Sequence, residues 1–375
     1  MRAAFLHSAE MEKYHYPPQC PFKTERAAMT RTLLVSMGSY MTDGTAEVPP
    51  APATRTELEQ FHAPAYLDAL RRATDGKITP NDLFLGLGGD ETPIFPGLYE
   101  YVSLAAGASI AGARMLLSSE ATYAFNPSGG LHHAYPDKAG GFCYVNDIVL
   151  ACKELAHAGK KVFCLDLDAH HGNGTQFAFY HDPRVLTISF HESGKTLYPW
   201  SGFENEIGVG AGTGYNVNIP FPPGADDAAY EYAFRQIIPP LLGWYAPDTI
   251  VLELGMDVLA GDPLTHLRLS NNAFADILLD LMEAGKPMLV TGGGGYNPEA
   301  TARGWALAWR ILCGLETDDS GQIGLGGTFL GSNEWGSGLR EMRVYTRQDE
   351  REQIMQSVQT SVETIKKTVF ALHRI

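Results

Sequence analysis

The segment that decides the fold is Lys160–Gln176, which reads KKVFCLDLDAHHGNGTQ. Its apolar run, 162–165, predicts a buried strand, and Asp166, Asp168 and His170 follow at every second position. Because residues spaced by two lie on one face of a strand, three ionisable groups gather where this strand ends. Aspartate and histidine are seldom buried without a partner. Carboxylate oxygen and imidazole nitrogen together suit a divalent ion such as zinc.

Other polar residues also follow predicted strands directly. The apolar stretch PDTIVLELG precedes Asp257, and a later strand runs into four glycines and Tyr296. His132 and His133 follow a further short strand, in a glycine-rich loop that permits an irregular backbone. Back at the opening segment, the sequence 172–174 (Gly-Asn-Gly) predicts a chain reversal.

Predicted strands alternate with predicted helices over most of the chain. This alternation is typical of an α/β fold with a central, mainly parallel sheet and helices on both faces. Ligands of such folds bind outside the carboxyl ends of the strands, which is where the polar residues above are expected. Pro64 is expected to split or kink a helix predicted over 56–74. No repeat or linker is evident, so we expect residues 1–375 to form a single domain.

Composition narrows the classes of function. The formal net charge of the 375 residues is −15, which disfavours nucleic-acid binding and favours cationic ligands. Five cysteines without a CxxC pair argue against disulfides and against a thiolate zinc site. The amino terminus lacks a signal-peptide core and no apolar run is long enough to span a membrane, so a cytoplasmic protein is expected.

The polar residues fit one reaction class, metal-assisted hydrolysis of an amide. Asp168, His170 and Asp257 match a three-ligand catalytic zinc site with a position left open. His132 and His133 suit proton transfer near neutral pH, and Tyr296 suits hydrogen bonding to a developing oxyanion. Two further residues are candidates for orienting the histidines: Asp166 and Asn173.

Five motifs occur in the order GGLHHA, GFCYVND, DLDAHHGNGTQ, ELGMD and GGGGY. This set resembles the histone deacetylase family and its bacterial relatives, the acetoin-utilisation and acetylpolyamine amidohydrolase branches. The resemblance runs from about residue 23 to about residue 314. It implies the arginase–deacetylase α/β fold and a zinc-dependent deacetylase, with Asp168, His170 and Asp257 as ligands. It also implies His133 as the general base and acid, beside His132, with Tyr296 at the transition state.

The resemblance further implies the surroundings of the site. A narrow tunnel for the acyl-lysine stem would be lined by Gly141, Phe142, Tyr198 and Leu264. Asp90 would hold the substrate backbone and Arg26 would lie in a channel for acetate release, although by composition alone Asp90 belongs to a surface loop and Arg26 to a surface helix. The family also binds potassium. One potassium site would use Asp166, Asp168, His170, Ser189 and Phe190, and the other Phe179, Asp182, Val185 and Tyr215.

Two residues depart from the commonest family pattern. Asn173 stands where some branches carry an aspartate, so it should raise the pKa of His133 less than a carboxylate would. Tyr198 stands where many relatives carry phenylalanine, which adds a hydroxyl to the tunnel wall. Neither departure removes a catalytic group.

Several alternatives remain open from the sequence. The substrate is an acetylated lysine of a protein or peptide, or a small acetylated amine such as an acetylpolyamine. Two oxygens and one nitrogen also suit ferrous iron. An arginase-like enzyme needs a second metal and an aspartate where Gly172 stands, and a non-catalytic scaffold would not need the full ligand set. The oligomeric state is not evident from the sequence.

Overall fold

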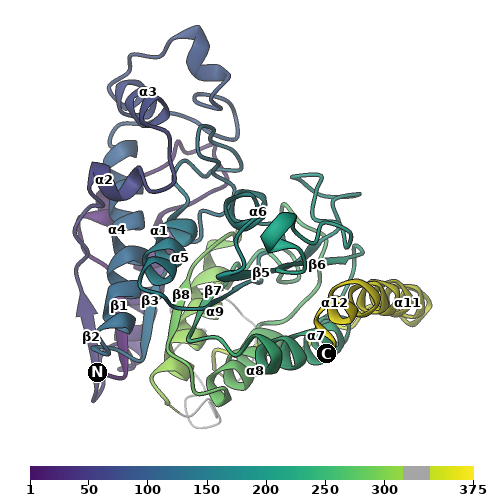
Figure 1. The fold of residues 1–375 in the computed structure, drawn as a ribbon. Helices are drawn as coiled ribbons and strands as arrows, with labels where there is room; N and C mark the ends of the chain where they lie inside the picture. Colours follow the sequence, from purple (N-terminus) through teal and green to yellow (C-terminus); the bar gives the residue numbers. More distant parts are fainter. Residues whose placement is uncertain (316–337) are drawn as a thin grey trace.

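The computed structural model of the chain describes residues 1–315 and 338–375. Its centre is one sheet of eight strands in the order β2-β1-β3-β8-β7-β4-β5-β6, with every neighbouring pair parallel (Figure 1). The strands are β1 (Ala3–Leu6), β2 (Thr45–Val48), β3 (Tyr123–Asn126), β4 (Val162–Asp166), β5 (Val185–Glu192), β6 (Asn216–Phe221), β7 (Thr249–Glu253) and β8 (Met288–Thr291). The predicted α/β fold with a parallel sheet is confirmed.

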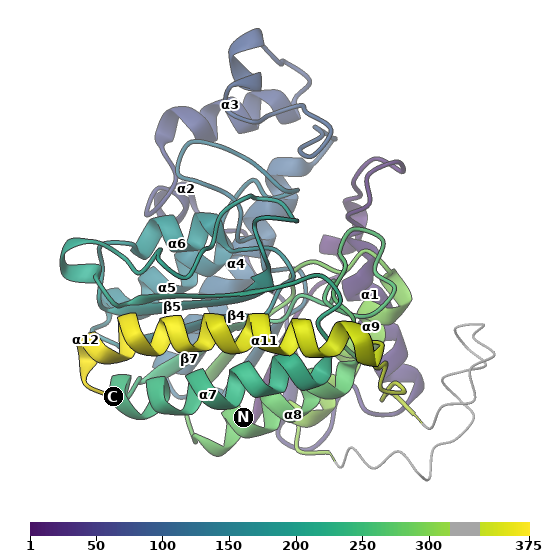
Figure 2. The same cartoon turned by 90° about the vertical axis from the view of Figure 1, so that its right-hand side faces the viewer.

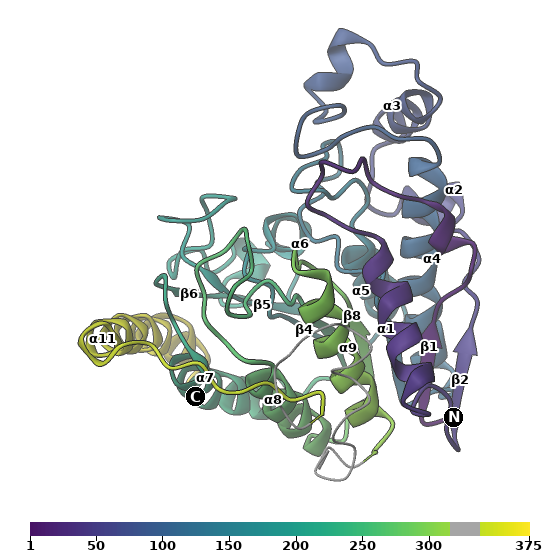
Figure 3. The same ribbon diagram turned by 180° about the vertical axis from the view of Figure 1, so that it is seen from behind.

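Helices cover both faces of the sheet. On one side lie α4 (Leu98–Leu117) and α5 (Asp147–His157), which pack against each other and against the sheet (Figure 1). On the other side α1 (Glu25–Ser36) packs against α9 (Pro298–Leu312), as Figure 3 shows from behind. The same side carries α7 (Asp227–Tyr245), α8 (Asn271–Glu283) and α11 (Gln348–Ile365). Shorter helices are α2 (Arg55–Leu58), α3 (Pro64–Thr74), α6 (Asn173–Phe179) and α12 (Ala371–His373).

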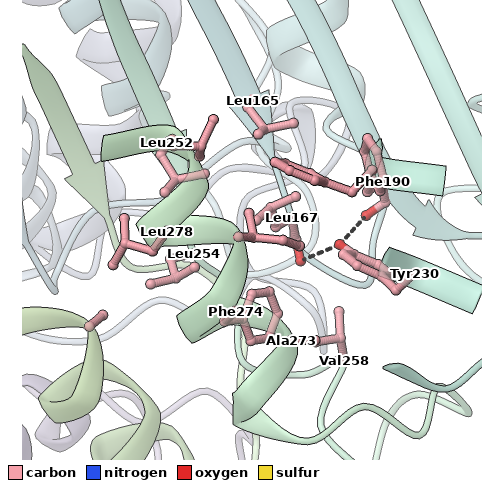
Figure 4. Packing of buried hydrophobic residues seen from close by; sticks show 14 of the residues in the cluster. Leu165, Leu167, Phe190, Tyr230, Leu252, Leu254, Val258, Ala273, Phe274 and Leu278 are labelled. Carbon is pink, nitrogen blue, oxygen red and sulfur yellow. Dashed lines mark hydrogen bonds between the residues drawn. The ribbon is translucent and has the colours of Figure 1, made fainter. Parts of the chain in front are cut away.

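Alternation along the strands divides the core between the two faces. In β7, Ile250 and Leu252 belong to the cluster beneath α7 and α8, whereas Val251 faces α4 and α5. Figure 4 shows the first cluster, in which Leu252 lies near Leu165. There the hydroxyl of Tyr230 donates to the Leu167 and Phe190 carbonyls, at 3.3 and 3.5 Å. These hydrogen bonds hold the backbone just beyond β4 and near the end of β5 in place.

The carboxyl-terminal helix lies along the β6 end of the sheet. Figure 2 shows α11 running beside α7 and in front of the strands, and it contacts both β6 and α7. Near its end the His373 ring stacks on Trp244 with centroids 3.8 Å apart, and His373 Nε2 lies 3.0 Å from the Gly214 carbonyl oxygen. The helix therefore covers an edge strand that would otherwise offer unpaired backbone groups.

Three features differ from the sequence-based expectations. The edge strand β2 was not predicted, since its four residues, TAEV, are only half-buried and carry no clear alternation. Residues 172–174 form no chain reversal, because α6 begins at Asn173. A side chain at Gly174 would overlap the Ala134 carbonyl, so this glycine serves close packing. β4 ends at Asp166, and Asp168 and His170 lie in the bend beyond it.

Pro64 splits the predicted 56–74 helix as expected, into α2 and α3. The sequence is also rich in glycine over 321–338, and all of this segment except Gly338 lies outside the described residues. Among the described helices, none combines the length and apolar character needed to cross a membrane.

Candidate metal centre and catalytic site

Three predicted ligands meet beyond the ends of β4 and β7. The ligand atoms of Asp168, His170 and Asp257 all lie within 4.8 Å of one another, and all three residues are buried. His170 Nδ1 is 3.1 Å from Asp168 Oδ1 and 2.9 Å from Asp257 Oδ2. Two carboxylates therefore converge on a single imidazole nitrogen, which is the donor set of a divalent metal with one histidine and two aspartates.

The electrostatics of these residues show why a cation fits here. Burial and the neighbouring charge of Asp168 raise the pKa of Asp257 to about 7. Burial alone would lower the pKa of His170, but its hydrogen bonds to Asp168 and Asp257 raise it to about 10. The two buried carboxylates of Asp168 and Asp257 thus share one proton, on His170 Nδ1. A divalent ion bound at this point would offset the negative charges of both carboxylates. The residues present fit zinc, and two oxygens with one nitrogen fit ferrous iron as well.

The glycine run 292–295 brings backbone directly against this cluster. The Gly294 amide donates to Asp168 Oδ2 at 2.6 Å, and a side chain at Gly294 would overlap the Asp257 carboxylate. Arg26 fixes the run from behind, because its Nη1 donates to the carbonyls of Gly293 and Gly295 at 3.0 and 2.9 Å. The sequence thus needs glycine here for close approach, and Arg26 is a buried residue of the site rather than a surface arginine.

His132 and His133 lie beside the metal ligands and face each other. Their Nε2 atoms are 3.1 Å apart. His132 Nδ1 lies 2.9 Å from Asp166 Oδ2, and His133 Nδ1 lies 2.9 Å from Asn173 Oδ1. Because that Asn173 oxygen also accepts from the Gly174 amide at 3.0 Å, His133 Nδ1 carries a hydrogen and Nε2 carries a lone pair.

The two histidines have opposite electrostatic environments. Burial lowers the pKa of His133 well below its ordinary value, and the neighbouring His132 and His170 lower it further. Burial would also lower the pKa of His132, but the carboxylates of Glu253 and Asp166 outweigh burial and raise it well above the ordinary value. Two groups with pKa values pushed apart match the pattern of an acid–base pair.

Tyr296 directly follows the glycine run and lies near the ligand His170. Its ring centroid lies 6.2 Å from the His170 ring and its amide donates to Asp262 Oδ2 at 2.7 Å. Burial, together with the charges of Asp257 and Asp168, raises the pKa of Tyr296 well above 10. The hydroxyl therefore stays protonated and can donate a hydrogen bond.

Most of the predicted tunnel residues lie around His133 and Tyr296. A side chain at Gly141 would overlap the His133 ring, and the Tyr198 ring stands edge-on to His133 at 5.1 Å. Phe142 lies 5.7 Å from the Tyr296 ring. The Phe142 amide donates to the Glu91 carbonyl at 2.9 Å, which brings the exposed loop of Asp90 alongside this wall.

Leu264 is placed less directly, through the carboxylate of Asp262. The Leu264 amide donates to Asp262 Oδ1 at 2.9 Å, and the other oxygen of Asp262 accepts from Tyr296.

The predicted potassium residues form two groups. In the first, Asp166 pairs with Ser189 across β4 and β5, and both line a small polar cavity beside Gln176. In the second, the backbone of Phe179, Asp182 and Val185 makes the turn between α6 and β5, and the Tyr215 carbonyl accepts from the Thr187 amide beside it. Asp166 and Ser189 of the first group are thus neighbours, as are the residues of the second group along the chain from α6 to β5.

Two residues near the site were missed by sequence reasoning. Glu253 ends β7 opposite Asp166, and its Oε2 lies 3.1 Å from His132 Nδ1. Asp262 joins Tyr296 to the Leu264 loop. The sequence contains one indication of Glu253, because it is a lone acid inside the apolar run TIVLEL. Asp262, in the segment GDPLT, resembles an ordinary turn residue.

Comparison with known proteins supplies the family. Residues 20–312 match the family model described as "Histone deacetylase domain". Histone deacetylase clr6 of Schizosaccharomyces pombe is 37% identical over 322 residues, which cover 85% of this chain and 78% of that protein. Histone deacetylase RPD3 of Saccharomyces cerevisiae is 39% identical over 325 residues, covering 84% and 73%. These relatives are eukaryotic and give no support to the predicted bacterial branch.

Solved structures agree with the sequence comparison. The crystal structure of an HDAC homolog from Aquifex aeolicus superposes with a TM-score of 0.85 at 30% identity, covering 97% of this chain and 99% of that one. An HDAC homolog complexed with SAHA gives a TM-score of 0.86 at 30% identity, with the same coverage. The parallel sheet, the buried cluster at its edge and these likenesses together show that the chain belongs to the histone deacetylase family.

Proposed function

We propose that the protein is a zinc-dependent amidohydrolase that removes acetyl or other acyl groups from lysine side chains of proteins or peptides. The observation that carries the proposal is the convergence of Asp168, His170 and Asp257 within 4.8 Å, directly beside His133 and Tyr296. Residues 1–375 would act as one domain, in the cytoplasm, without nucleic acid or membrane. The formal charge of −15 is consistent with a cationic substrate.

In this proposal the chain's own groups divide the work of hydrolysis. A bound zinc ion would polarise the acyl carbonyl and lower the pKa of water. His133, neutral and with a lone pair on Nε2, takes a proton from the attacking water and returns it to the leaving amine nitrogen as the C–N bond breaks. Tyr296 donates a hydrogen bond to the developing oxyanion. Acetate and a free amine are the products.

The remaining predicted residues surround this chemistry. Asp166 and Asn173 orient His132 and His133 through the ring nitrogens that face away from the metal ligands. Gly141, Phe142, Tyr198 and Leu264 would line the path of the lysine stem, with Asp90 at its mouth and Arg26 beside an exit for acetate. Potassium at the two predicted sites would stabilise the backbone around β4 and β5.

A second candidate substrate is a small acetylated amine such as an acetylpolyamine. The exposed acids Asp90 and Glu91 beside the tunnel wall favour any cationic substrate and do not distinguish the two classes. Turnover of an acetyl-lysine peptide should therefore be compared with that of N-acetylputrescine on the zinc-loaded protein. We expect a higher kcat/KM for the peptide, and a clear preference for N-acetylputrescine would reverse the assignment.

A further inference from the structure

The acid at the end of β7 is a buried carboxyl group beside His132 that the proposed reaction does not use. Glu253 is 1% exposed. Its Oε2 lies 3.1 Å from His132 Nδ1, without the angle of a hydrogen bond, and neither carboxyl oxygen has a hydrogen-bond partner among the described residues. Leaving a buried polar group unpaired lowers the stability of the folded protein. Buried groups of this kind occur where a function retains them.

The neighbours of Glu253 indicate which function that is. Asp166 Oδ2 already accepts from His132 Nδ1 at 2.9 Å, so two carboxyl groups face the same edge of one imidazole ring. No other polar group of the described chain is recorded within hydrogen-bond distance of that nitrogen. The arrangement keeps the Nδ1 hydrogen toward the acids and directs Nε2 toward His133, 3.1 Å away.

We propose that Glu253 is a positioning residue for the tandem histidines, retained at a cost in stability because its carboxyl oxygens hold the His132 ring by its Nδ1 edge. The inference rests on the proposed function, since it assigns a role within the same site. It goes beyond that function because it assigns a residue of β7 to the orientation of the His132 ring. Without Glu253, only Asp166 of β4 would orient this ring.

A competing reading is a second cation site. His132, Asp168 and Glu253 offer ligand atoms within 4.8 Å of one another. An ion bound there would have Glu253 and His132 as ligands, and together with the ion at Asp168, His170 and Asp257 it would make two zinc ions per chain. The number of zinc ions bound per chain therefore separates the two readings.

The test uses Glu253→Leu and Glu253→Gln in the zinc-loaded full chain. Leucine has a similar volume and no polar atom, whereas glutamine keeps an oxygen acceptor. We expect Glu253→Leu to raise the Tm, since an unpaired buried group is removed, yet to lower kcat about 10- to 100-fold with KM and zinc content unchanged. Glu253→Gln should recover most of the lost kcat. Asp227→Asn is the control for loss of a buried carboxylate, because Asp227 binds Ser270 and lies outside the site.

A readout without turnover keeps this test separate from the proposed function. The ring N–H proton of His132 should give a downfield resonance, identified by its loss in His132→Ala. It should stay near its wild-type position in Glu253→Gln and shift in Glu253→Leu, where Asp166 alone contacts the N–H. Wild-type kcat or an unchanged resonance in Glu253→Leu, or two zinc ions per wild-type chain, would overturn the inference. Absence of turnover in the wild type would instead count against the proposed function alone.

Discussion

At the scale of single residues, the different surroundings of His133 and Tyr296 give these two side chains different roles. Burial and neighbouring histidines lower the pKa of His133, so its ring is neutral near pH 7 and can accept a proton. Burial and two aspartates raise the pKa of Tyr296, so its hydroxyl keeps its proton. The same edge of the sheet thus presents a proton acceptor and a hydrogen-bond donor, each with its ring near that of His170.

Tyr296→Phe tests the donor. The phenyl ring keeps the packing against Phe142 but cannot donate to an oxyanion, so kcat should fall about 100- to 1,000-fold. Zinc content, measured by elemental analysis, should not change. Turnover close to that of the wild type would remove Tyr296 from the proposed mechanism.

Asn173→Asp tests the acceptor through the pH dependence of kcat/KM. A carboxylate at His133 Nδ1 favours the charged ring and raises the pKa of His133. Because only neutral His133 accepts a proton, activity should then be lost at a higher pH as the solution is acidified. The acid limb should move upward by about one pH unit. Asn81→Asp, on an exposed turn, is the control, and an unmoved limb in Asn173→Asp would contradict the assignment of His133 as base.

At the scale of elements, the site depends on backbone as much as on side chains. The ligands lie in bends beyond β4 and β7, and the glycine run after β8 contacts them through the Gly294 amide. Arg26 holds this run in place through hydrogen bonds to the carbonyls of Gly293 and Gly295. Each of these three strands is only four or five residues long, so the loops beyond them, rather than the strands, set the ligand geometry.

Gly294→Ala tests this backbone approach. The added methyl would overlap Asp257, so the carboxylate must move and zinc affinity should fall about 10- to 100-fold. Gly243→Ala is the matched control, because Gly243 lies in α7 with open space at its Cβ position and should gain about 0.5–1 kcal/mol of helix stability. Equal zinc affinity in the two variants would show that the loop tolerates a side chain.

The sequence predicted these elements unevenly, for physical reasons. Long apolar runs flanked by glycine, such as the one before Asp257, identified the central strands. The edge strand β2 has no such run, and the start of α6 was hidden by two glycines that serve close packing instead of a turn. Glu253 could not be recognised as part of the site, because its nearness to His132 arises from the pairing of β4 with β7, which are far apart in sequence.

At the scale of the whole molecule, buried neutral histidines tie stability to pH. His62 is 1% exposed and accepts a hydrogen bond from the Asn146 amide at 3.0 Å. Burial lowers the pKa of His62 to about 4, from an ordinary value near 6.5. In the unfolded chain the ring takes up a proton at the higher pH. The stability that neutral His62 provides is therefore complete above about pH 6.5 and is lost as the pH falls toward 4.

His62→Gln removes this proton uptake while keeping an acceptor. Between pH 7 and pH 4 the free energy of unfolding of the wild type should fall by about 3 kcal/mol more than that of the variant. Urea titrations of both proteins at several pH values measure the difference. Parallel curves would show that His62 is solvated or already charged in the folded protein.

The most direct test of the central claim joins metal content to turnover in one preparation. We expect the purified chain to bind one zinc ion, to hydrolyse an acetyl-lysine peptide, to lose that activity on chelation and to regain it with zinc. Asp257→Asn should lose both the ion and the activity. Undiminished hydrolysis by the metal-free protein, or full zinc binding by Asp257→Asn, would contradict the claim that Asp168, His170 and Asp257 hold the metal that makes this chain a deacetylase.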